Sequence, residues 1–176
     1  KLFWDEENRG FFFYGSDAEQ LIARPKEVYD GAIPSGNSVM AYNLIRHGRL
    51  TGSGTFDKYA ELQLQAFSAS INRYPSGHTF FLCAGQLALG NSMEIVIAGG
   101  ENEEVFGAMV QQVQRSYLPF TVFIVNSKEQ RGKLKELAPA HEDKVAINGK
   151  SALYVCENFT CQQPIFALDD VKQRLS

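Results

Sequence analysis

Two short polar stretches hold the residues whose types and spacing are best suited to chemistry. Residues 33–38 read IPSGNS and residues 74–79 read YPSGHT, so both contain Pro-Ser-Gly followed by a polar side chain and a hydroxyl. The polar side chain is Asn37 in the first stretch and His78 in the second. An imidazole exchanges protons near neutral pH, and an amide both donates and accepts hydrogen bonds. His78 is therefore a candidate catalytic acid or base, and Asn37 a candidate binding residue for a polyol or an anion.

The same stretches are typical of helix starts, which gives each of them a purely structural interpretation. Glycine permits tight backbone geometry, and Ser35, Ser38, Ser76 or Thr79 can accept hydrogen bonds from the first free N–H groups of a helix. The functional alternative is that two neighbouring helix N-termini face one cleft, where these serines bind substrate beside Asn37. The histidine of the second stretch is likewise either catalytic or a buried, hydrogen-bonded core residue.

The charged segment before the first stretch supplies candidate carboxylates. Residues 24–32 read RPKEVYDGA and contain Glu27 and Asp30. A glycosidase needs two carboxylates facing one bond, and an epimerase needs acid and base groups on both sides of a carbon. We take Asp30, and after it Glu27, as catalytic candidates. The alternative is a solvated charge run that ends in an Asp-Gly turn.

The cysteines allow a redox interpretation. Cys156 and Cys161 are spaced C-x4-C, which is not the C-x-x-C of thioredoxins, and two thiolates alone do not close a zinc site. They are either packing residues or a redox-sensitive or partner-facing pair, because the intervening residues read as a loop that could bring the sulfurs together. With Cys83 the chain has three cysteines, an odd and low number that favours a reducing compartment and hence a cytoplasmic location. The glycosylation sequon at 158–160 carries little weight without a secretory signal.

Composition excludes several classes of function. The 176 residues are 44% hydrophobic and 12% aromatic, which suits a globular core. A net charge of -3 argues against nucleic-acid and anionic-membrane partners, and no apolar run approaches the roughly 20 residues that span a bilayer. The stretch IAGGENEE, residues 97–104, lacks the residues of a phosphate-binding loop, and its glutamates would repel phosphate, so we predict no nucleotide there. We also expect no other cofactor and no metal. The first residues, KLFWDEENRG, resemble no signal peptide and lack Met, so we expect a fragment or a processed product.

The first half of the sequence predicts a β-hairpin followed by three helices. GFFFYG reads as a strand, and LIARPKEVY reads as a return strand that Pro25 interrupts. A helix that ends at Gly48 follows the first Pro-Ser-Gly, and its helical spacing is carried by Val39, Met40, Asn43, Leu44 and His47. A second helix starts at Thr55 or Asp57, with one buried face formed by Tyr59, Leu62, Ala66, Phe67, Ser70, Ile71 and Tyr74. The third, TFFLCAGQLAL, is apolar on nearly every side and must be buried all round.

The second half of the sequence follows a strand–helix pattern. MEIVIAGG and FTVFIVN read as strands, each followed by a helix, the second of which takes Ser127 as its N-cap. Residues 144–158 read as a hairpin about Asn148-Gly149, and LDDVKQRL as a final helix. This order predicts a small, partly parallel sheet, with a boundary near residues 90–92.

The first ninety residues expose more apolar surface than three helices and a hairpin can cover among themselves. Either the α/β layer covers that surface, or the helices belong to a larger helical domain. We favour the larger domain.

Three stretches taken together resemble a known family. They are residues 3–38, which begin FWDEENRGFFFYG and end at IPSGNS; YPSGHTFF; and YVCENFTCQQP near the end. As a set they resemble the C-terminal part of the thioredoxin-domain-containing family related to spermatogenesis-associated protein 20. The resemblance implies a thioredoxin-like domain, absent from this chain, followed by an α/α toroid similar to six-hairpin glycosidases and N-acylglucosamine epimerases. Hairpins in such toroids recur every forty or so residues, which matches the spacing of the two Pro-Ser-Gly stretches.

The sequence and the resemblance together predict an α+β fold, with residues 1–91 as the closing part of an α/α toroid with a β-hairpin and residues 92–176 as a small α/β subdomain. The expected function is to contribute to a carbohydrate-binding or carbohydrate-modifying cleft. The alternative is a non-catalytic module that docks or regulates the thioredoxin-like domain through a redox-sensitive Cys156–Cys161 pair. The expected partners are a carbohydrate, the thioredoxin-like domain and the rest of the toroid. Self-association through an open toroid side is also expected.

Overall fold

A computed structural model describes residues 2–19, 22–157 and 160–175 of the chain. The sequon at 158–160 therefore lies mostly outside the described residues. The chain divides into two compact units. The first holds the residues up to Gly48 together with Ser53–Gly90, and the second holds Arg49–Gly52 together with the residues from Asn91 onward.

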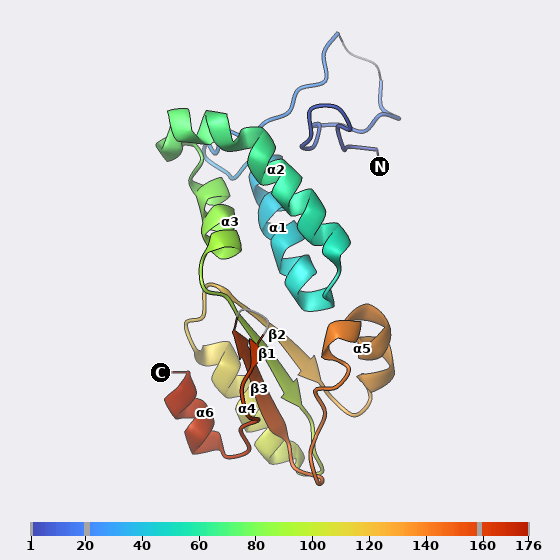
Figure 1. The fold of residues 1–176 in the computed structure, drawn as a ribbon, viewed down its shortest axis with the longest axis vertical. Helices are drawn as coiled ribbons and strands as arrows, with labels where there is room; N and C mark the ends of the chain where they lie inside the picture. Colours follow the sequence, from blue (N-terminus) through green and yellow to red (C-terminus); the bar gives the residue numbers. More distant parts are fainter. Residues whose placement is uncertain (1, 20–21, 158–159, 176) are drawn as a thin grey trace. The chain divides into compact units, whose positions relative to one another are not determined.

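Three helices dominate the first unit (Figure 1). They are α1 (Gly36–Thr51), α2 (Gly54–Arg73) and α3 (Thr79–Leu89), and a short 3-10 turn, Pro75–Gly77, precedes α3. Both α1 and the 3-10 turn begin within a Pro-Ser-Gly stretch, so the prediction that these stretches start helices is confirmed. The first helix continues past Gly48 to Thr51, because glycine lowers helix stability without ending a helix by itself.

The helices of the first unit bury only one face each. In α1 the buried apolar side chains are Ala41, Leu44 and Ile45, whereas most of the predicted spacing set, Val39 and Met40 included, lies on the exposed side. In α2, Phe67 and Ile71 are buried as predicted, but Ala66, Ser70 and Tyr74 are exposed. The prediction that α3 is buried all round is wrong for this chain, because Leu82 is 44% exposed and Leu89 is 89% exposed. A single helical layer cannot cover both sides of an apolar helix.

The predicted N-terminal β-hairpin does not form among the described residues. Phe12 N–H donates to Phe3 O at 2.7 Å, and Trp4 and Phe11 make an isolated antiparallel bridge, so the aromatic run lies beside residues 2–4. The segment read as a return strand contributes one backbone bond, from Phe13 N–H to Pro25 O at 2.9 Å. Proline offers no N–H to a ladder, which explains why regular pairing fails there.

The second unit is an α/β layer. Its strands are β1 (Met93–Ala98), β2 (Thr121–Asn126), β3 (Ala152–Glu157) and β4 (Thr160–Cys161), and its helices are α4 (Glu103–Arg115), α5 (Arg131–Leu137) and α6 (Leu168–Arg174), with a 3-10 turn at Pro139–His141. The sheet order is β2-β1-β3-β4, in which β1 and β2 are parallel and the other pairs antiparallel. The predicted partly parallel sheet is confirmed, and the chain is an α+β protein.

The core of the second unit lies between one face of the sheet and two helices. Ile95 and Ile97 of β1 and Leu153 of β3 pack with Met109 of α4 and Val171 of α6. Figure 1 shows α4 and α6 on the same side of the sheet and α5 on the other. The side chains of β1 alternate between these two faces, as in any strand.

Two details of the second unit differ from prediction. The Asn148-Gly149 turn forms, with positive φ angles of 50° and 74°, but the only bridge across it is Ile147–Lys150 within the described chain. The strand that follows pairs with β1 and β4 instead, because pairing with β1 buries its apolar side chains in the core. Ser127 does not cap α5; Gln130 stands at that position.

Over the described residues, no helix is long and apolar enough to cross a membrane.

Candidate functional site

Asp30 joins the N-terminal ends of two helices in the first unit. Its Oδ1 accepts a hydrogen bond from Ser35 N–H at 2.9 Å, directly before α1. Its Oδ2 accepts from Phe80 N–H at 2.8 Å and from Phe81 N–H at 3.2 Å, in the first turn of α3. The first N–H groups of a helix have no partner within the helix, and a carboxylate also complements the positive end of the helix dipole. The N-termini of two helices thus converge, as expected from the sequence, and the anion that lies between them is the Asp30 carboxylate.

The surroundings of Asp30 keep its carboxyl ionised. Burial on its own would raise the pKa of Asp30, but the hydrogen bonds from Ser35, Ser38, Phe81 and Phe80 outweigh it and hold the pKa below its usual value. The side chain is only 9% exposed, and both carboxylate oxygens are engaged by backbone donors. This geometry is that of a helix cap shared by two helices.

The serines of the two Pro-Ser-Gly stretches have different environments. Ser35 Oγ accepts from Ser38 N–H at 3.2 Å and lies 2.8 Å from Ser38 Oγ, so this pair caps the first turn of α1. Both are buried. Ser76, in contrast, is exposed in the short turn before α3. The three predicted binding serines are therefore not gathered at one surface.

His78 lies at the start of α3 and is 5% exposed. Its Nδ1 is 2.8 Å from the carbonyl oxygen of Tyr74, which can only accept, so Nδ1 carries the proton in this arrangement. The ring meets Tyr29 edge to face at a centroid distance of 6.3 Å. Asp30 is held next to this histidine, because the Asp30 N–H donates to the carbonyl oxygen of Gly77, the preceding residue, at 2.8 Å. His78 and Asp30 thus belong to one buried junction.

Asn37 ties together three segments of the first unit. Its Oδ1 accepts from Phe11 N–H at 2.7 Å and from Gln63 Nε2 at 3.2 Å. Its Nδ2 donates to Phe11 O at 2.9 Å and to Glu27 O at 2.7 Å. Asn37 is 2% exposed, and its amide oxygen and nitrogen both hydrogen-bond within the protein. This side chain therefore positions the segments that it contacts.

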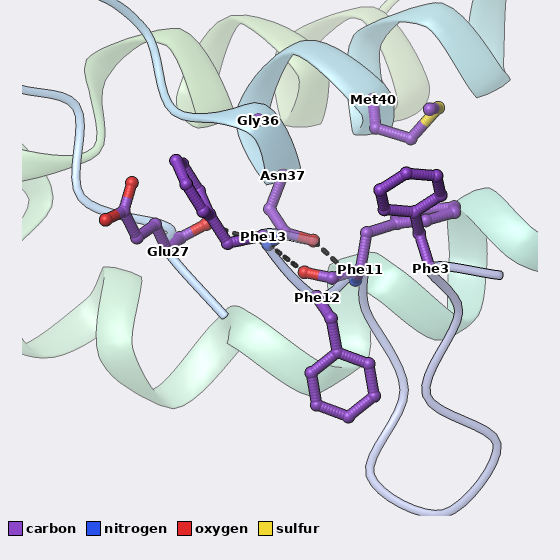
Figure 2. Close-up of a pocket in the computed structure, with 8 residues that line it drawn as sticks. All are labelled: Phe3, Phe11, Phe12, Phe13, Glu27, Gly36, Asn37 and Met40. Atoms are coloured by element: carbon purple, nitrogen blue, oxygen red, sulfur yellow. Dashed lines mark hydrogen bonds between the residues drawn. The ribbon is translucent and has the colours of Figure 1, made fainter. Parts of the chain in front are cut away.

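A pocket of about 400 Å³ opens beside this amide, at the first turn of α1 (Figure 2). The residues that line it are mainly apolar and are Phe3, Phe11, Phe12, Phe13, Glu27, Gly36, Asn37 and Met40. Figure 2 shows the rings of Phe3 and Phe11 together near Met40 and the Phe13 ring beside Glu27, whereas the Phe12 ring points the opposite way. The volume lies within the range of small-ligand sites, which are typically apolar with a few placed polar groups.

Glu27 carries the only carboxylate among the described residues that line this pocket. Its backbone is fixed by the Asn37 amide, and its side chain is exposed. Of the two predicted carboxylates, Glu27 therefore faces solvent beside a cavity, and Asp30 is enclosed. The sequence offers no reason to choose the phenylalanines, because the aromatic run reads as a strand; the glycines that flank it are the available sign of an irregular segment.

Cys156 of β3 and Cys161 of β4 form a disulfide in the second unit. The neighbouring Gln162 N–H donates to Val155 O at 2.9 Å, so the two cysteines form a pair without mutual backbone hydrogen bonds, where facing side chains come closest. Cys156 is 2% exposed and Cys161 is exposed, so solvent reaches the bond from the Cys161 side. Cys83 is a free, exposed cysteine of α3.

The groups at the start of α4 do not favour the binding of a phosphate. Asn102 Oδ1 accepts from Val105 N–H at 3.1 Å, and Glu101 N–H donates to Gly149 O at 2.7 Å. Glu103 and Glu104 add negative charge to the first turn. Within the described chain, no group of three or more His, Cys, Asp or Glu side chains is placed to hold a metal ion.

Comparison with known proteins finds similarity over nearly the whole chain. Over 168 residues, 94% of the chain, it is 33% identical to spermatogenesis-associated protein 20 from Homo sapiens and 31% identical to the protein of that name from Mus musculus. An uncharacterized protein from Caenorhabditis elegans is 23% identical over 172 residues. The chain spans about a fifth of the length of these relatives, 21% for the human protein. These similarities relate the chain to one part of spermatogenesis-associated protein 20.

Two further comparisons are negative. No protein-family model matches the chain. No solved structure matches it.

Proposed function

We propose that the first unit forms one wall of a carbohydrate-binding or carbohydrate-modifying cleft in a longer protein. The observation that carries this proposal is the pocket at the start of α1, which combines several phenylalanines with the carboxylate of Glu27. Apolar ring faces accommodate the C–H face of a sugar, and a carboxylate accepts hydrogen bonds from its hydroxyls or transfers a proton.

The other candidate residues take supporting roles in this proposal. Asn37 holds the backbones of Phe11 and Glu27, two opposite parts of the pocket lining, at a fixed separation. Asp30 and His78 fix the junction between the start of α1 and the start of α3. Glu27 is therefore the residue that we assign to the ligand, and a second carboxylate would come from elsewhere in the longer protein.

We also propose that these helices are the closing part of an α/α toroid, whose remaining helices cover the exposed apolar side chains of α1 and α3. Val39 and Met40 of α1 and Leu82 and Leu89 of α3 are more than a third exposed, and further helices would cover them. The limited share of the relatives' length that the chain spans supports the same idea. The thioredoxin-like domain, the rest of the toroid and a second copy of the chain are the proposed protein partners, and no nucleic acid or membrane is among them.

A sugar-library binding screen on the full-length protein tests the carbohydrate proposal. We expect at least one neutral or acidic sugar to bind, with an affinity that falls about tenfold or more in Glu27→Gln, since hydrogen bonds to charged groups contribute about 1.5–3 kcal/mol. Glu61→Gln is the control, because Glu61 is exposed on α2 and does not line the pocket. No binding, or equal loss in both variants, would contradict the proposal.

A second candidate function is favoured by the disulfide. The second unit would be a non-catalytic module that docks or regulates the thioredoxin-like domain, with Cys156 and Cys161 as a redox-sensitive pair at the contact. A cytoplasmic location is part of this proposal. In the cytoplasm a disulfide is typically transient and exchanges with dithiol proteins. The exposed Cys161 sulfur is the accessible point of attack.

Thiol trapping in the full-length protein tests this second function. Cys156→Ser leaves Cys161 unable to re-form the internal bond, so a mixed disulfide between Cys161 and the thioredoxin-like domain should accumulate. The control is Cys83→Ser, which removes an exposed thiol that has no disulfide partner. If alkylation of both Cys156 and Cys161 changes neither redox activity nor domain association, the second function is wrong.

A further inference from the structure

A buried glutamate lies directly beside the disulfide in the sheet. In the β1–β3 register Glu94 is opposite Cys156, and in the β3–β4 register Cys156 is opposite Cys161. Residues opposite each other in adjacent strands point to the same face, so the three side chains form one row across β1, β3 and β4. Facing side chains in such rows have Cβ atoms about 4.5–5.5 Å apart. The Glu94 and Cys156 side chains are therefore lateral neighbours on one face of the sheet.

The row runs from the interior to solvent. Glu94 is 4% exposed and Cys156 is 2% exposed, whereas Cys161 is exposed. Glu94 Oε1 is buried and has no hydrogen-bond partner within the part of the chain that the structure describes. A buried acid without a full set of hydrogen bonds lowers the stability of the fold. On the other side of Glu94, the same row holds the buried Val122, which is the type of residue that the interior of a sheet ordinarily takes. Stability therefore does not explain the acid.

We propose that Glu94 is the proton donor and acceptor for thiol–disulfide exchange at Cys156–Cys161, an inference that rests on the second candidate function. The co-reactant is a dithiol, either a small molecule or the active site of a dithiol protein. Access decides the direction of attack, because Cys161 is the exposed cysteine of the pair and Cys156 is buried.

The exchange consists of two displacements. A thiolate of the co-reactant attacks Cys161 Sγ, the Cys156–Cys161 bond breaks, and a mixed disulfide forms on Cys161. The electron pair of the broken bond leaves on Cys156 Sγ, and the burial of Cys156 disfavours a thiolate there. The carboxyl proton of Glu94 passes to this sulfur, giving a neutral thiol and a carboxylate. The second thiol of the co-reactant loses its proton to solvent and attacks the co-reactant sulfur of the mixed disulfide, and Cys161 leaves as a thiolate that takes a proton from solvent. The co-reactant is thereby oxidised to its disulfide, the cysteine pair is reduced to a dithiol, and Glu94 regains its proton from solvent. In the reverse direction the Glu94 carboxylate takes the proton from Cys156.

The environment of Glu94 suits an acid that is protonated before the step. Burial raises the pKa of Glu94, and the positive charge of Arg49 acts in the opposite direction. Tyr154 of β3 lies on the same face of the sheet, and its hydroxyl donates to Val145 O. The segment before β3 carries three more titratable groups. They are His141, whose Nε2 is 3.1 Å from Arg49 O, and Lys144 and Asp143, which pair at 2.6 Å. Arg49 is the charge placed to stabilise the carboxylate once the proton has left.

The test is the rate of disulfide reduction by dithiothreitol in the intact 176-residue chain, followed from pH 5 to 9 by acid quench, alkylation and mass spectrometry of the 156–161 peptide. The rate constant is divided by the thiolate fraction of dithiothreitol at each pH. For the wild type we expect this corrected constant to be high at low pH and to fall as pH rises through the pKa of Glu94. Glu94→Gln should lower it about tenfold or more at the low-pH plateau and abolish the inflection, since general acid catalysis contributes roughly 10²–10⁴-fold.

Two companion variants make the outcome specific. Glu157→Gln is the matched control, because Glu157 is the next residue of β3, points to the opposite face and is exposed; its profile should equal that of the wild type. Glu94→Asp keeps an acid and should retain an inflection, which a merely structural role would not predict. If Glu94→Gln does not fold, the profiles of the wild type and Glu94→Asp decide, and a flat corrected profile in both overturns the proposal.

The remaining outcomes separate the inference from the function on which it rests. Reduction at an equal corrected rate in the wild type and Glu94→Gln overturns the role of Glu94 and leaves the exchangeable disulfide standing. Failure of excess dithiothreitol to reduce the pair in the folded chain overturns both.

Discussion

At the scale of single residues, Asp30 illustrates how a carboxylate that suits catalysis can be enclosed by the backbone. It accepts from three N–H groups at the starts of two helices, and a carboxylate in that position stabilises both. Glu27, three residues earlier, makes no comparable contact through its side chain and lines a pocket. Asp30 therefore caps two helices and Glu27 lines a pocket because their contacts differ.

The first prediction concerns the free energy of unfolding. Asp30→Asn replaces one accepting oxygen with an NH2 group that faces N–H donors, so we expect a loss of about 1–3 kcal/mol. Urea denaturation at neutral pH measures it. Glu27→Gln serves as the control and should change stability by less than about 0.5 kcal/mol. Equal stability of Asp30→Asn and wild type would mean that the shared cap is unimportant.

Asp5 gives the second prediction, on acid stability. The hydrogen bond from Lys26, with N–H donors from Asn8 and Glu7, lowers the pKa of Asp5 from 3.8 to about 2. Because the folded-state pKa is the lower one, this contribution to stability is complete above about pH 4 and is lost as pH falls toward 2. The Lys26–Asp5 pair is partly in contact with water, so we expect on the order of 1–2 kcal/mol. Lys26→Met should flatten the decrease between pH 5 and 2.5 in urea titrations; an unchanged decrease would contradict the assignment.

At the scale of elements, the backbone that follows β1 packs closely against the Asn148-Gly149 turn. Gly100 N–H donates to Ser151 Oγ at 3.0 Å, and a Cβ at Gly100 would overlap backbone atoms of residues 149–151. Here glycine is required by close approach and not by an unusual φ angle.

The third prediction follows from that approach. Gly100→Ala must displace the turn, and we expect a cost of about 1–3 kcal/mol. Gly107→Ala in α4 is the matched control, because no atom lies within 4 Å of the added Cβ, and alanine should stabilise the helix by about 0.5–1 kcal/mol. Thermal unfolding of the two variants should therefore shift in opposite directions. A shift of both in the same direction would show that the turn adapts without strain.

The elements themselves were largely predictable, because hydrophobic periodicity and helix-start residues act locally. The starts of α1 and of the turn before α3, and the strands β1 and β2, follow from residues within a few positions of each other. The link from Asp30 to Phe80 and the pairing of Glu94 with Cys156 each join residues 50 or more positions apart. No local pattern specifies such pairings, and strand register in particular emerges only when the sheet is assembled.

At the scale of the whole molecule, α1 and α3 expose apolar side chains, and the chain spans about a fifth of the length of its relatives. The predicted self-association of the chain belongs to this scale. We expect light scattering to show dimers or larger species, and a Met40→Glu, Leu82→Glu double variant to reduce them, because both side chains are exposed and apolar. A chain that is monomeric at all concentrations would contradict this prediction.

The claim that the pocket beside α1 is a ligand site is tested by a structure of the full-length protein soaked with a binding sugar. We expect an open cavity in which the sugar lies against the phenylalanines of the lining, within hydrogen-bonding distance of the Glu27 carboxylate, with a second carboxylate from another segment about 5–10 Å away. A cavity filled by the protein's own side chains, with Glu27 engaged by them, would contradict the claim.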